Sequence, residues 1–308
     1  MRHGSRKLLH NIRKNPSLYL MVSFGIVWFL VFSYTPMFGL VIAFKEYRIS
    51  KGVFGSDWVG LRHFIRFFED YYSFRIVRNT FLLAFYNILF GFPVPIILAI
   101  LINEVRNSFL RRTVQSISYF PHFISTVIVV GLINLILSPS GAVNSIVKAL
   151  NLNDGQSILF LTRPEWFRPI YIISEIWQDA GWGSIIYLAA ISGIDPQLYE
   201  AAKIDGANRY QCIYRITIPS LMPTIRILFI VKSASILSIG FEKVYLLYNP
   251  AVYETADVIN TYVYRIGIAM GSDFSYSTAI GLFRGIISFV MLVTVNQLSK
   301  KLAKESLF

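Results

Sequence analysis

The chain has 308 residues, of which 55% are hydrophobic, 16% are aromatic and only 15% are charged, and its net charge is +12. A soluble domain carries about a quarter charged residues, so this composition excludes an ordinary cytosolic enzyme and predicts a single membrane-embedded body. The only cysteine, Cys212, excludes an internal disulfide and a thiolate metal cluster.

Uncharged stretches predict the first three membrane spans. Residues 15–44 and 79–103 hold 30 and 25 residues without a charge. Each stretch is long enough to cross a hydrocarbon core of about 30 Å as a helix. Pro121 and the Ser-Pro-Ser-Gly turn that begins at Ser138 confine the third span, and a short amphipathic helix at the membrane surface is expected after it.

Three further apolar stretches contain ionisable residues. Glu175 and Asp179 interrupt the fourth span, Arg226 and Lys232 the fifth, and Arg284 the sixth. An ionised group in the membrane costs about 2.5–3.5 kcal/mol on insertion scales, so such groups normally face a cavity or a partner. We therefore predict an all-α membrane protein with six transmembrane helices, at about 18–44, 76–102, 122–138, 169–191, 220–240 and 277–298.

The distribution of basic residues predicts the orientation of these spans. With the N-terminal tail 1–17 in the cytoplasm, the cytoplasmic segments hold 14 Lys and Arg in 64 residues, and the opposite segments hold 11 in 98. Both termini are therefore expected in the cytoplasm of a multi-pass protein of the cell (inner) membrane. The first apolar run is too long for a cleaved signal peptide. Membrane topology accounts for most of the positive charge, so no nucleic-acid partner is expected.

No catalytic or nucleotide-binding motif accompanies the spans. A G-x-x-x-x-G-K-[ST] phosphate loop does not occur, so the chain is not expected to hydrolyse ATP itself. The four histidines include no pair at metal-ligand spacing, and no metal site is predicted. A membrane enzyme that uses Glu175 and Asp179, which share a helix face, is an alternative that would require catalysis by the isolated chain.

The connection between the fourth and fifth spans, residues 195–219, is longer than a simple turn requires. Asp195 and Pro196 predict an N-cap followed by proline at the first helical position, and Gly206 predicts the end of that helix. A second helical stretch is expected to lead into the membrane through Pro219. Such a loop could insert into a groove of a partner or lie solvated without one, and the residues alone leave both interpretations open.

The spacing within this loop resembles a known family signature. The loop contains Glu-Ala-Ala at 200–202, Gly206, and, after nine further residues, Ile-Thr-Ile-Pro at 216–219. This spacing is similar to the EAA signature, E-A-A-x(3)-G-x(9)-I-x-L-P, of permease subunits of binding-protein-dependent ABC importers. Ile218 in place of leucine is the one departure. The resemblance implies a maltose-type permease fold, with residues 1–308 forming one transmembrane permease domain.

Membership of this family would imply a mechanism. Such permeases pair with a second, related permease subunit to form a pore, and their EAA loops sit in clefts of two ATPase subunits. ATP and Mg are bound by those ATPases, so no cofactor is expected in this chain. An extracytoplasmic solute-binding protein delivers the sugar, and closure of the ATPases turns the pore outward. The resemblance assigns ATPase coupling, with the glutamate as the ion-pairing residue, to Glu200, Ala201, Ala202, Asp205, Gly206 and Pro219.

Two further stretches narrow the resemblance. Residues 118–125 (Ser-Tyr-Phe-Pro-His-Phe-Ile-Ser) and 240–250 (Gly-Phe-Glu-Lys-Val-Tyr-Leu-Leu-Tyr-Asn-Pro) look like the subfamily that imports oligo- and polysaccharides, including alginate and pectin-derived fragments. The resemblance implies import of a saccharide, which could be acidic, such as alginate. The residues do not reveal the particular sugar, its length or the identity of the partner permease.

Polar and aromatic residues of the membrane region are the candidates for the sugar pathway. Aromatic faces and hydrogen-bonding groups suit sugar rings, and Gly181 and Gly183 permit a local break or a close helix approach beside Trp182. Structural ion pairs between the two acids of the fourth span and the cations of the fifth and sixth are the alternative interpretation. The candidate pathway residues are Glu175, Trp177, Gln178, Asp179, Trp182, Lys232 and Arg284.

A carrier or channel driven by an ion gradient is a second class of function that would explain acids in the membrane. Inverted repeats or a pair of broken helices would mark it, and the sequence contains no persuasive internal repeat. The loop 195–219 would then have no purpose. We therefore predict a permease subunit of an ABC importer, and co-purification with an ATPase would separate the two functions.

Overall fold

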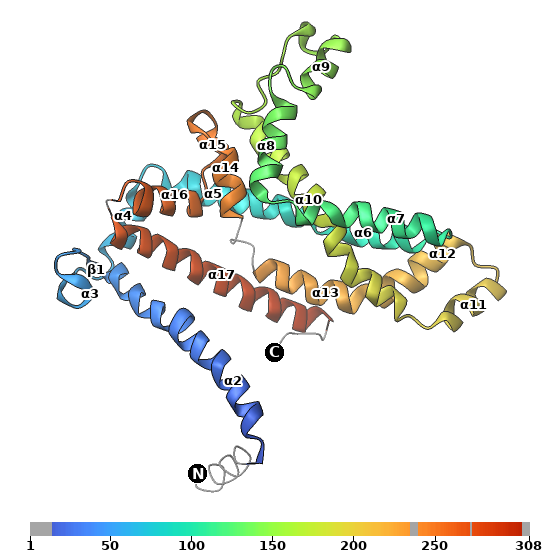
Figure 1. Cartoon of the computed structure of the whole chain (residues 1–308), viewed down its shortest axis with the longest axis horizontal. Coiled ribbons are helices and arrows are strands. Elements are labelled where there is room, and N and C mark those ends of the chain that lie inside the picture. Colours follow the sequence, from blue (N-terminus) through green and yellow to red (C-terminus); the bar gives the residue numbers. More distant parts are fainter. Residues whose placement is uncertain (1–13, 235–239, 272, 304–308) are drawn as a thin grey trace. The chain divides into compact units, whose positions relative to one another are not determined.

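The computed structural model describes residues 14–234, 240–271 and 273–303, and Figure 1 shows that they are almost wholly helical. The chain divides into two compact units. The smaller unit contains the residues up to Phe67 together with Ile266–Leu282, and the larger unit contains Phe68–Arg265 together with the residues from Phe283 onward.

The smaller unit begins with a helical stretch that matches the first predicted span. α2 (Pro16–Phe29), η1 (Leu30–Tyr34) and η2 (Thr35–Phe44) follow one another without a break. The strands β1 (Lys45–Glu46) and β2 (Asp57–Trp58) then pair antiparallel, and no other strand occurs in the described residues. The all-α prediction is therefore confirmed apart from this short pairing. The remaining helices here are α3 (Gly52–Gly55) and most of α4 (Arg62–Glu69).

Long-range side-chain contacts hold the smaller unit together. Arg66 Nη1 donates to Asp273 Oδ2 at 2.5 Å, and the guanidinium carbon lies 4.3 Å from the centre of the Tyr276 ring. The Tyr47 amide donates to Ser275 Oγ at 2.9 Å. The segment after the first span is thereby joined to the beginning of the last helix.

The larger unit contains the second to fifth predicted spans and most of the connections. η8 (Arg265–Ala269) and α17 (Phe274–Ala303) cross the boundary between the two units. The helices of the larger unit are α5 (Ser73–Tyr86), η3 (Asn87–Gly91), α6 (Pro93–Asn103), α7 (Ser108–Tyr119), η4 (Phe120–Phe123), α8 (Thr126–Leu137), α9 (Ala142–Ala149), η5 (Leu152–Gly155), α10 (Pro164–Ser192), α11 (Pro196–Ile204), α12 (Arg209–Cys212), η6 (Ile213–Thr217), α13 (Ile218–Ala234), α14 (Phe241–Leu247), η7 (Pro250–Val252), α15 (Tyr253–Ala256) and α16 (Ile259–Tyr264).

Within the described residues, five helical stretches are long and apolar enough to span a membrane, and they overlap five of the six predicted spans. The predicted fourth span lies within α10, whose 29 residues include two acids in its membrane part, and α10 is not among these five. Residues 235–239, the end of the predicted fifth span, lie outside the described residues. The five stretches are 16–44, 73–103, 126–149, 209–233 and 274–297.

The third predicted span is shorter than expected. The helix begins at Thr126 rather than at about 122, because the side chain of Ser125 caps its first turn by accepting from the Ile128 amide. α8 has 12 residues and is therefore only about 18 Å long. The predicted turn after Ser138 is confirmed, since the chain leaves the helical conformation there and restarts as the short helix α9.

Three wide helical turns precede prolines. The π-helical segments η1, η3 and η6 each end two residues before a proline, namely Pro36, Pro93 and Pro219. Proline has no N–H and its ring crowds the preceding turn, and one wider turn accommodates it without ending the helix. Pro219 therefore does not interrupt the chain, and residues 209–233 form one helical stretch from the predicted coupling loop into the membrane.

α10 forms much of the core of the larger unit. Its first half contributes Phe167 and Tyr171 to an apolar core shared with α5, α8 and α14, and its second half contributes Tyr187 to another core shared with α6 and α13. Gly181 lets α10 cross α7 closely, because a Cβ at this position would lie 1.8 Å from the Ser118 carbonyl oxygen. The predicted close approach at this glycine is therefore confirmed, and α10 continues without a break there.

Candidate functional site

The predicted coupling loop consists of a helix, a glycine turn and a second helix. The side chain of Asp195 caps α11 as predicted. The helix ends before Gly206, which has φ of +80°. The Gly206 amide donates to the Lys203 carbonyl at 3.1 Å, and the Ala207 amide donates to the Ala202 carbonyl at 2.8 Å. These two bonds form a Schellman motif, in which the left-handed position strongly favours glycine.

Side chains that the EAA signature does not specify fasten this loop to the rest of the unit. Arg209 donates from Nε and Nη2 to the carboxylate and the backbone carbonyl of Glu104, the residue at the end of α6. Tyr199 Oη and Thr217 Oγ1 lie 2.9 Å apart and join α11 to η6. These contacts could not be predicted from the spacing of the residues. The only available signal was an acid and a base in two connections predicted to lie on the same side of the membrane.

The predicted coupling residues lie on the surface of the loop. Ala202 is half-buried, and the other five are exposed. Two large apolar side chains beside them also point outward, since Ile204 is 87% exposed and Tyr210 is 81% exposed. Figure 1 shows α11 and α12 together at one end of the larger unit. An exposed surface that mixes apolar and charged side chains suits contact with another protein.

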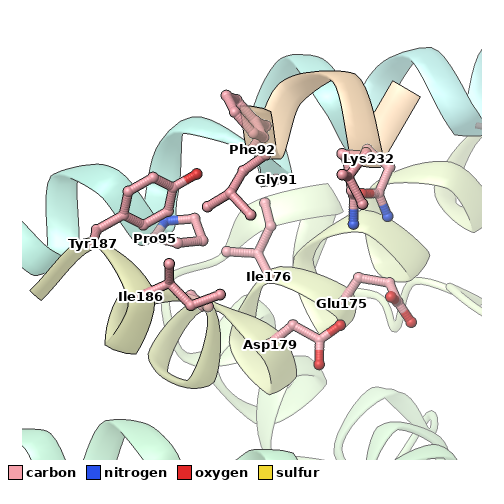
Figure 2. Close-up of a pocket in the computed structure, with 14 residues that line it drawn as sticks. Gly91, Phe92, Pro95, Glu175, Ile176, Asp179, Ile186, Tyr187 and Lys232 are labelled. Atoms are coloured by element: carbon pink, nitrogen blue, oxygen red, sulfur yellow. The ribbon is translucent and has the colours of Figure 1, made fainter. Parts of the chain in front are cut away.

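Three of the predicted pathway residues meet at a cavity of about 270 Å³. Its lining includes Glu175 and Asp179 of α10, Lys232 of α13, Asn87 of η3 and Pro95 of α6. Figure 2 shows the two acids on neighbouring turns of one helix, with the lysine on a different helix. Ionisable groups that face a shared cavity are the arrangement expected for a polar passage through a membrane.

Glu175 is paired with a lysine that lies outside the predicted spans. Lys243 Nζ of α14 lies 2.6 Å from Glu175 Oε1, and the two side chains are 4% and 21% exposed. The sequence pattern indicates cations of the fifth and sixth spans as partners of the two acids, and Lys243 is an additional cation that this pattern does not indicate. Lys243 lies beyond the predicted fifth span, and only the packing of α14 against the membrane helices brings it to α10.

Asp179 lies beside a stack of aromatic rings. His122 Nδ1 and Asp179 Oδ1 are 3.0 Å apart. The His122 ring stacks on Trp182 with centroids 4.7 Å apart and planes 3° apart, and Phe123 meets the same indole edge-on at 5.5 Å. Trp182 is 46% exposed. An indole that is held on one side and accessible elsewhere can offer an apolar surface to a sugar ring.

The other three predicted pathway residues lie elsewhere. Gln178 Nε2 donates to the Ile124 carbonyl at 3.0 Å, next to the start of α8. Trp177 lines a separate apolar cavity between α8 and α10. Arg284 donates from Nη1 to Asn260 Oδ1 and does not line the charged cavity. On α10, a helical rotation of about 100° per residue turns Trp177 and Gln178 away from the face that carries the two acids.

Comparisons with known proteins agree with these features. Residues 91–304 match the sequence model of the family described as binding-protein-dependent transport system inner membrane component. The chain is 45% identical to the polygalacturonan/rhamnogalacturonan transport system permease protein YteP of Bacillus subtilis (strain 168), over 98% of this chain and 94% of YteP. It is 41% identical to protein LplB of the same organism, over 96% and 92%.

A solved structure shares both the sequence and the fold. The crystal structure of a bacterial alginate ABC transporter in complex with an alginate pentasaccharide-bound periplasmic protein contains a chain that matches with a TM-score of 0.89 and 45% identity. The match covers 98% of this chain and 100% of that one, so it includes the exposed loop and the charged cavity. The chain therefore belongs to the binding-protein-dependent transport system inner membrane components, as a sugar ABC importer permease with the type I fold.

Proposed function

We propose that this permease translocates an acidic oligo- or polysaccharide across the cell membrane, driven by a separate ATPase that contacts the loop 195–219. The observation that carries the coupling role is the construction of the loop. It exposes the EAA residues, while the Schellman turn and the contacts of Arg209 and Tyr199 restrict its movement. A restrained loop that continues into a membrane helix can transmit displacement to the membrane region.

The chemistry of the relatives supports an acidic substrate. The relative YteP is named for polygalacturonan and rhamnogalacturonan, and a second solved relative, with 45% identity and a TM-score of 0.89, is described as importing the acidic polysaccharide alginate. The cavity between α10 and α13 suits such a ligand. Lys232 supplies a positive charge to this cavity, and Trp182 supplies an apolar surface nearby.

The remaining parts of the transporter lie outside this chain. The proposal includes a second permease subunit, two ATPase subunits that bind ATP and Mg, and an extracytoplasmic binding protein that delivers the saccharide. It also places both termini in the cytoplasm, following the distribution of basic residues. Glu200 is the proposed ion-pairing residue of the coupling loop, and its exposed position leaves it accessible to a partner.

The experiment that tests this function uses the complete transporter in proteoliposomes. The permease pair, the ATPase and the binding protein are reconstituted with ATP inside the vesicle, and uptake of labelled oligouronates is compared with ATP and with a non-hydrolysable analogue. We expect uptake only with ATP, and no effect of ionophores that collapse ion gradients. Uphill uptake by this chain alone, driven by an ion gradient, would overturn the proposal in favour of a secondary carrier.

Substitution of the cavity lysine tests the pathway. Lys232→Gln should lower the uptake of an oligouronate more than that of a neutral oligosaccharide, because the cavity then lacks this positive charge. Arg284→Gln should affect the two substrates equally, since this arginine lies away from the cavity. Equal losses for both substrates in the lysine variant would indicate that Lys232 has a structural role.

A further inference from the structure

A second cavity lies farther toward the beginning of α10. Its volume is about 510 Å³, and Arg168, Glu165, Tyr86 and Phe90 line it together with Pro169 and three isoleucines. Ile176 belongs to this cavity and to the charged one, and η3 contributes to both. The segment before α10 is predicted to lie outside the cell, so a solute that enters from outside would reach this cavity first.

Arg168 is the cation of this second cavity, and no carboxylate of the described residues pairs with it. Its Nη2 donates to Asn79 Oδ1, an uncharged amide oxygen, at 2.9 Å. Its Nε is enclosed by protein and has no hydrogen-bond partner, whereas Nη1 is neither bonded to a described residue nor enclosed. Apart from Glu165 and Arg168, the lining of this cavity is apolar or aromatic. In such surroundings a guanidinium with an unused terminal nitrogen binds a carboxylate strongly through charge-assisted hydrogen bonds.

Asn79 holds this guanidinium in one orientation. The Asn79 side chain is fully buried, and its Nδ2 donates to the carbonyl oxygens of Glu254 at 2.8 Å and Asp257 at 3.1 Å. The amide oxygen of Asn79 is therefore the group that faces Arg168. A donor that is oriented before the ligand arrives loses less entropy on binding.

Asp257, a buried acid whose backbone carbonyl accepts from Asn79, is already paired with another arginine. Asp257 accepts from Arg265 through both carboxylate oxygens, at 3.1 and 2.5 Å. Burial lowers the pKa of the Arg265 guanidinium, but the hydrogen bonds and charge of Asp257 outweigh burial and raise that pKa above its ordinary value. Both carboxylate oxygens of Asp257 are therefore occupied by Arg265, and this carboxylate is not available to Arg168.

The other walls of the cavity suit a sugar ring. The Tyr86 and Phe90 rings have centroids 6.2 Å apart, and Phe90 is 52% exposed. Aromatic faces of this kind contact the apolar face of a pyranose, while a few polar groups read its substituents. Arg78 and Glu254 also act on Arg168 electrostatically, with opposite signs. Selectivity here would therefore come from direct contact with the guanidinium and not from a general positive field.

We propose that Arg168, oriented by Asn79, recognises the carboxylate of a uronate residue at the outer end of the saccharide pathway. This inference rests on the proposed function and adds to it a selectivity site that precedes the charged cavity. It names uronate-containing oligosaccharides as the ligand class, with the carboxylate at Nη1 and the sugar ring against Tyr86 and Phe90.

Equilibrium binding to the purified complex of permease and ATPase subunits, without the binding protein, tests this assignment. The ligands are labelled trigalacturonate and its fully methyl-esterified form, which has the same rings but no charge. We expect the wild type to bind the acid more tightly than the ester. Arg168→Gln should raise the Kd of the acid about 10- to 100-fold, the effect of losing charge-assisted hydrogen bonds, and should change the Kd of the ester less than about twofold.

Matched variants separate this role from loss of folding. Arg168→Lys keeps the charge without the planar fork and should weaken binding of the acid by an intermediate factor. Arg163→Gln removes an equal charge from an exposed arginine that does not line the cavity, and it should leave both Kd values unchanged. An equal rise in Kd for acid and ester in both Arg168 variants, or no acid preference in the wild type, would overturn the inference.

A lipid phosphate is the other anion that such a site could bind. Complexes in nanodiscs of phosphatidylcholine, with and without phosphatidylglycerol, distinguish the two ligands. If Arg168→Gln leaves the Kd of trigalacturonate unchanged but reduces retention of phosphatidylglycerol, the site belongs to a lipid headgroup and the inference fails. Absence of ATP-driven uptake, with the acid preference in binding preserved, would instead refute the proposed function and leave the assignment of Arg168 intact.

Discussion

The ion pair between Lys243 and Glu175 permits a quantitative test of how α14 is held against α10. Lys243→Met preserves the length and the apolar stem of the side chain but removes the charge that lies 2.6 Å from the carboxylate. Removal of one partner of a buried ion pair costs about 3–5 kcal/mol, because the remaining charge is left uncompensated. Glu175 is 21% exposed, so we expect a loss near the lower end, about 3 kcal/mol.

Glu175→Gln should be at least as costly as the lysine variant. Lys243 is 4% exposed, and without the carboxylate its ammonium group would be buried without a counter-charge. The double variant removes both charges. The loss of stability in the double variant should therefore be smaller than the sum of the two single losses by about 2 kcal/mol or more. This difference is the coupling energy of a pair in direct contact.

The assay is thermal unfolding of the purified complex, followed by tryptophan fluorescence. A loss of about 3 kcal/mol should lower Tm by about 5–10 °C in a chain of this size. Lys148→Met is the matched control, since Lys148 is exposed on α9 and forms no ion pair with a described residue, and its effect should stay within about 0.5 kcal/mol. Strictly additive effects of the two single variants would refute the reasoning, because independent side chains show no coupling.

Three other predictions concern the coupling loop and the crossing of α10 with α7. Gly206→Val should lower the uptake per ATP hydrolysed, because φ of +80° strains a β-branched residue by about 1–2 kcal/mol. Gly206→Asn should have a milder effect. Unchanged substrate-stimulated ATPase activity and unchanged uptake in the valine variant would count against the coupling role. Arg209→Ala and Glu104→Gln should each reduce the uptake per ATP hydrolysed. The double variant should be no worse than the more affected single variant, because both substitutions act on the same contact between Arg209 and Glu104. An unchanged uptake per ATP in these variants would show that the contact does not serve coupling. Gly181→Ala should lower the Tm of the complex, at a cost of about 1–3 kcal/mol or more, since the new Cβ would overlap a backbone oxygen. Gly285→Ala is the control, because a Cβ at that position meets no atom within 4 Å. Equal Tm values for the two variants would contradict the close crossing of α10 and α7.

The membrane helices and the coupling loop could be predicted because their signals are local. An uncharged run of sufficient length indicates a span whatever packs against it. The ends of α11 depend on neighbouring residues alone, since Asp195 caps one end and Gly206 takes the left-handed conformation at the other. The third span was predicted less well, because a serine cap at residue 125 competes with a continuous apolar pattern.

The amino-acid sequence by itself therefore determined the membrane class, the helix order and the family signature. Each of these follows from the identity and spacing of residues that lie close together in the chain. The tertiary structure decided the partners of the charges. Glu175 meets Lys243, Asp179 meets His122 and Arg209 meets Glu104, and none of these pairs follows from spacing. Which charges meet depends on how each helix is rotated about its axis and where helices cross, and only the packed fold sets those angles.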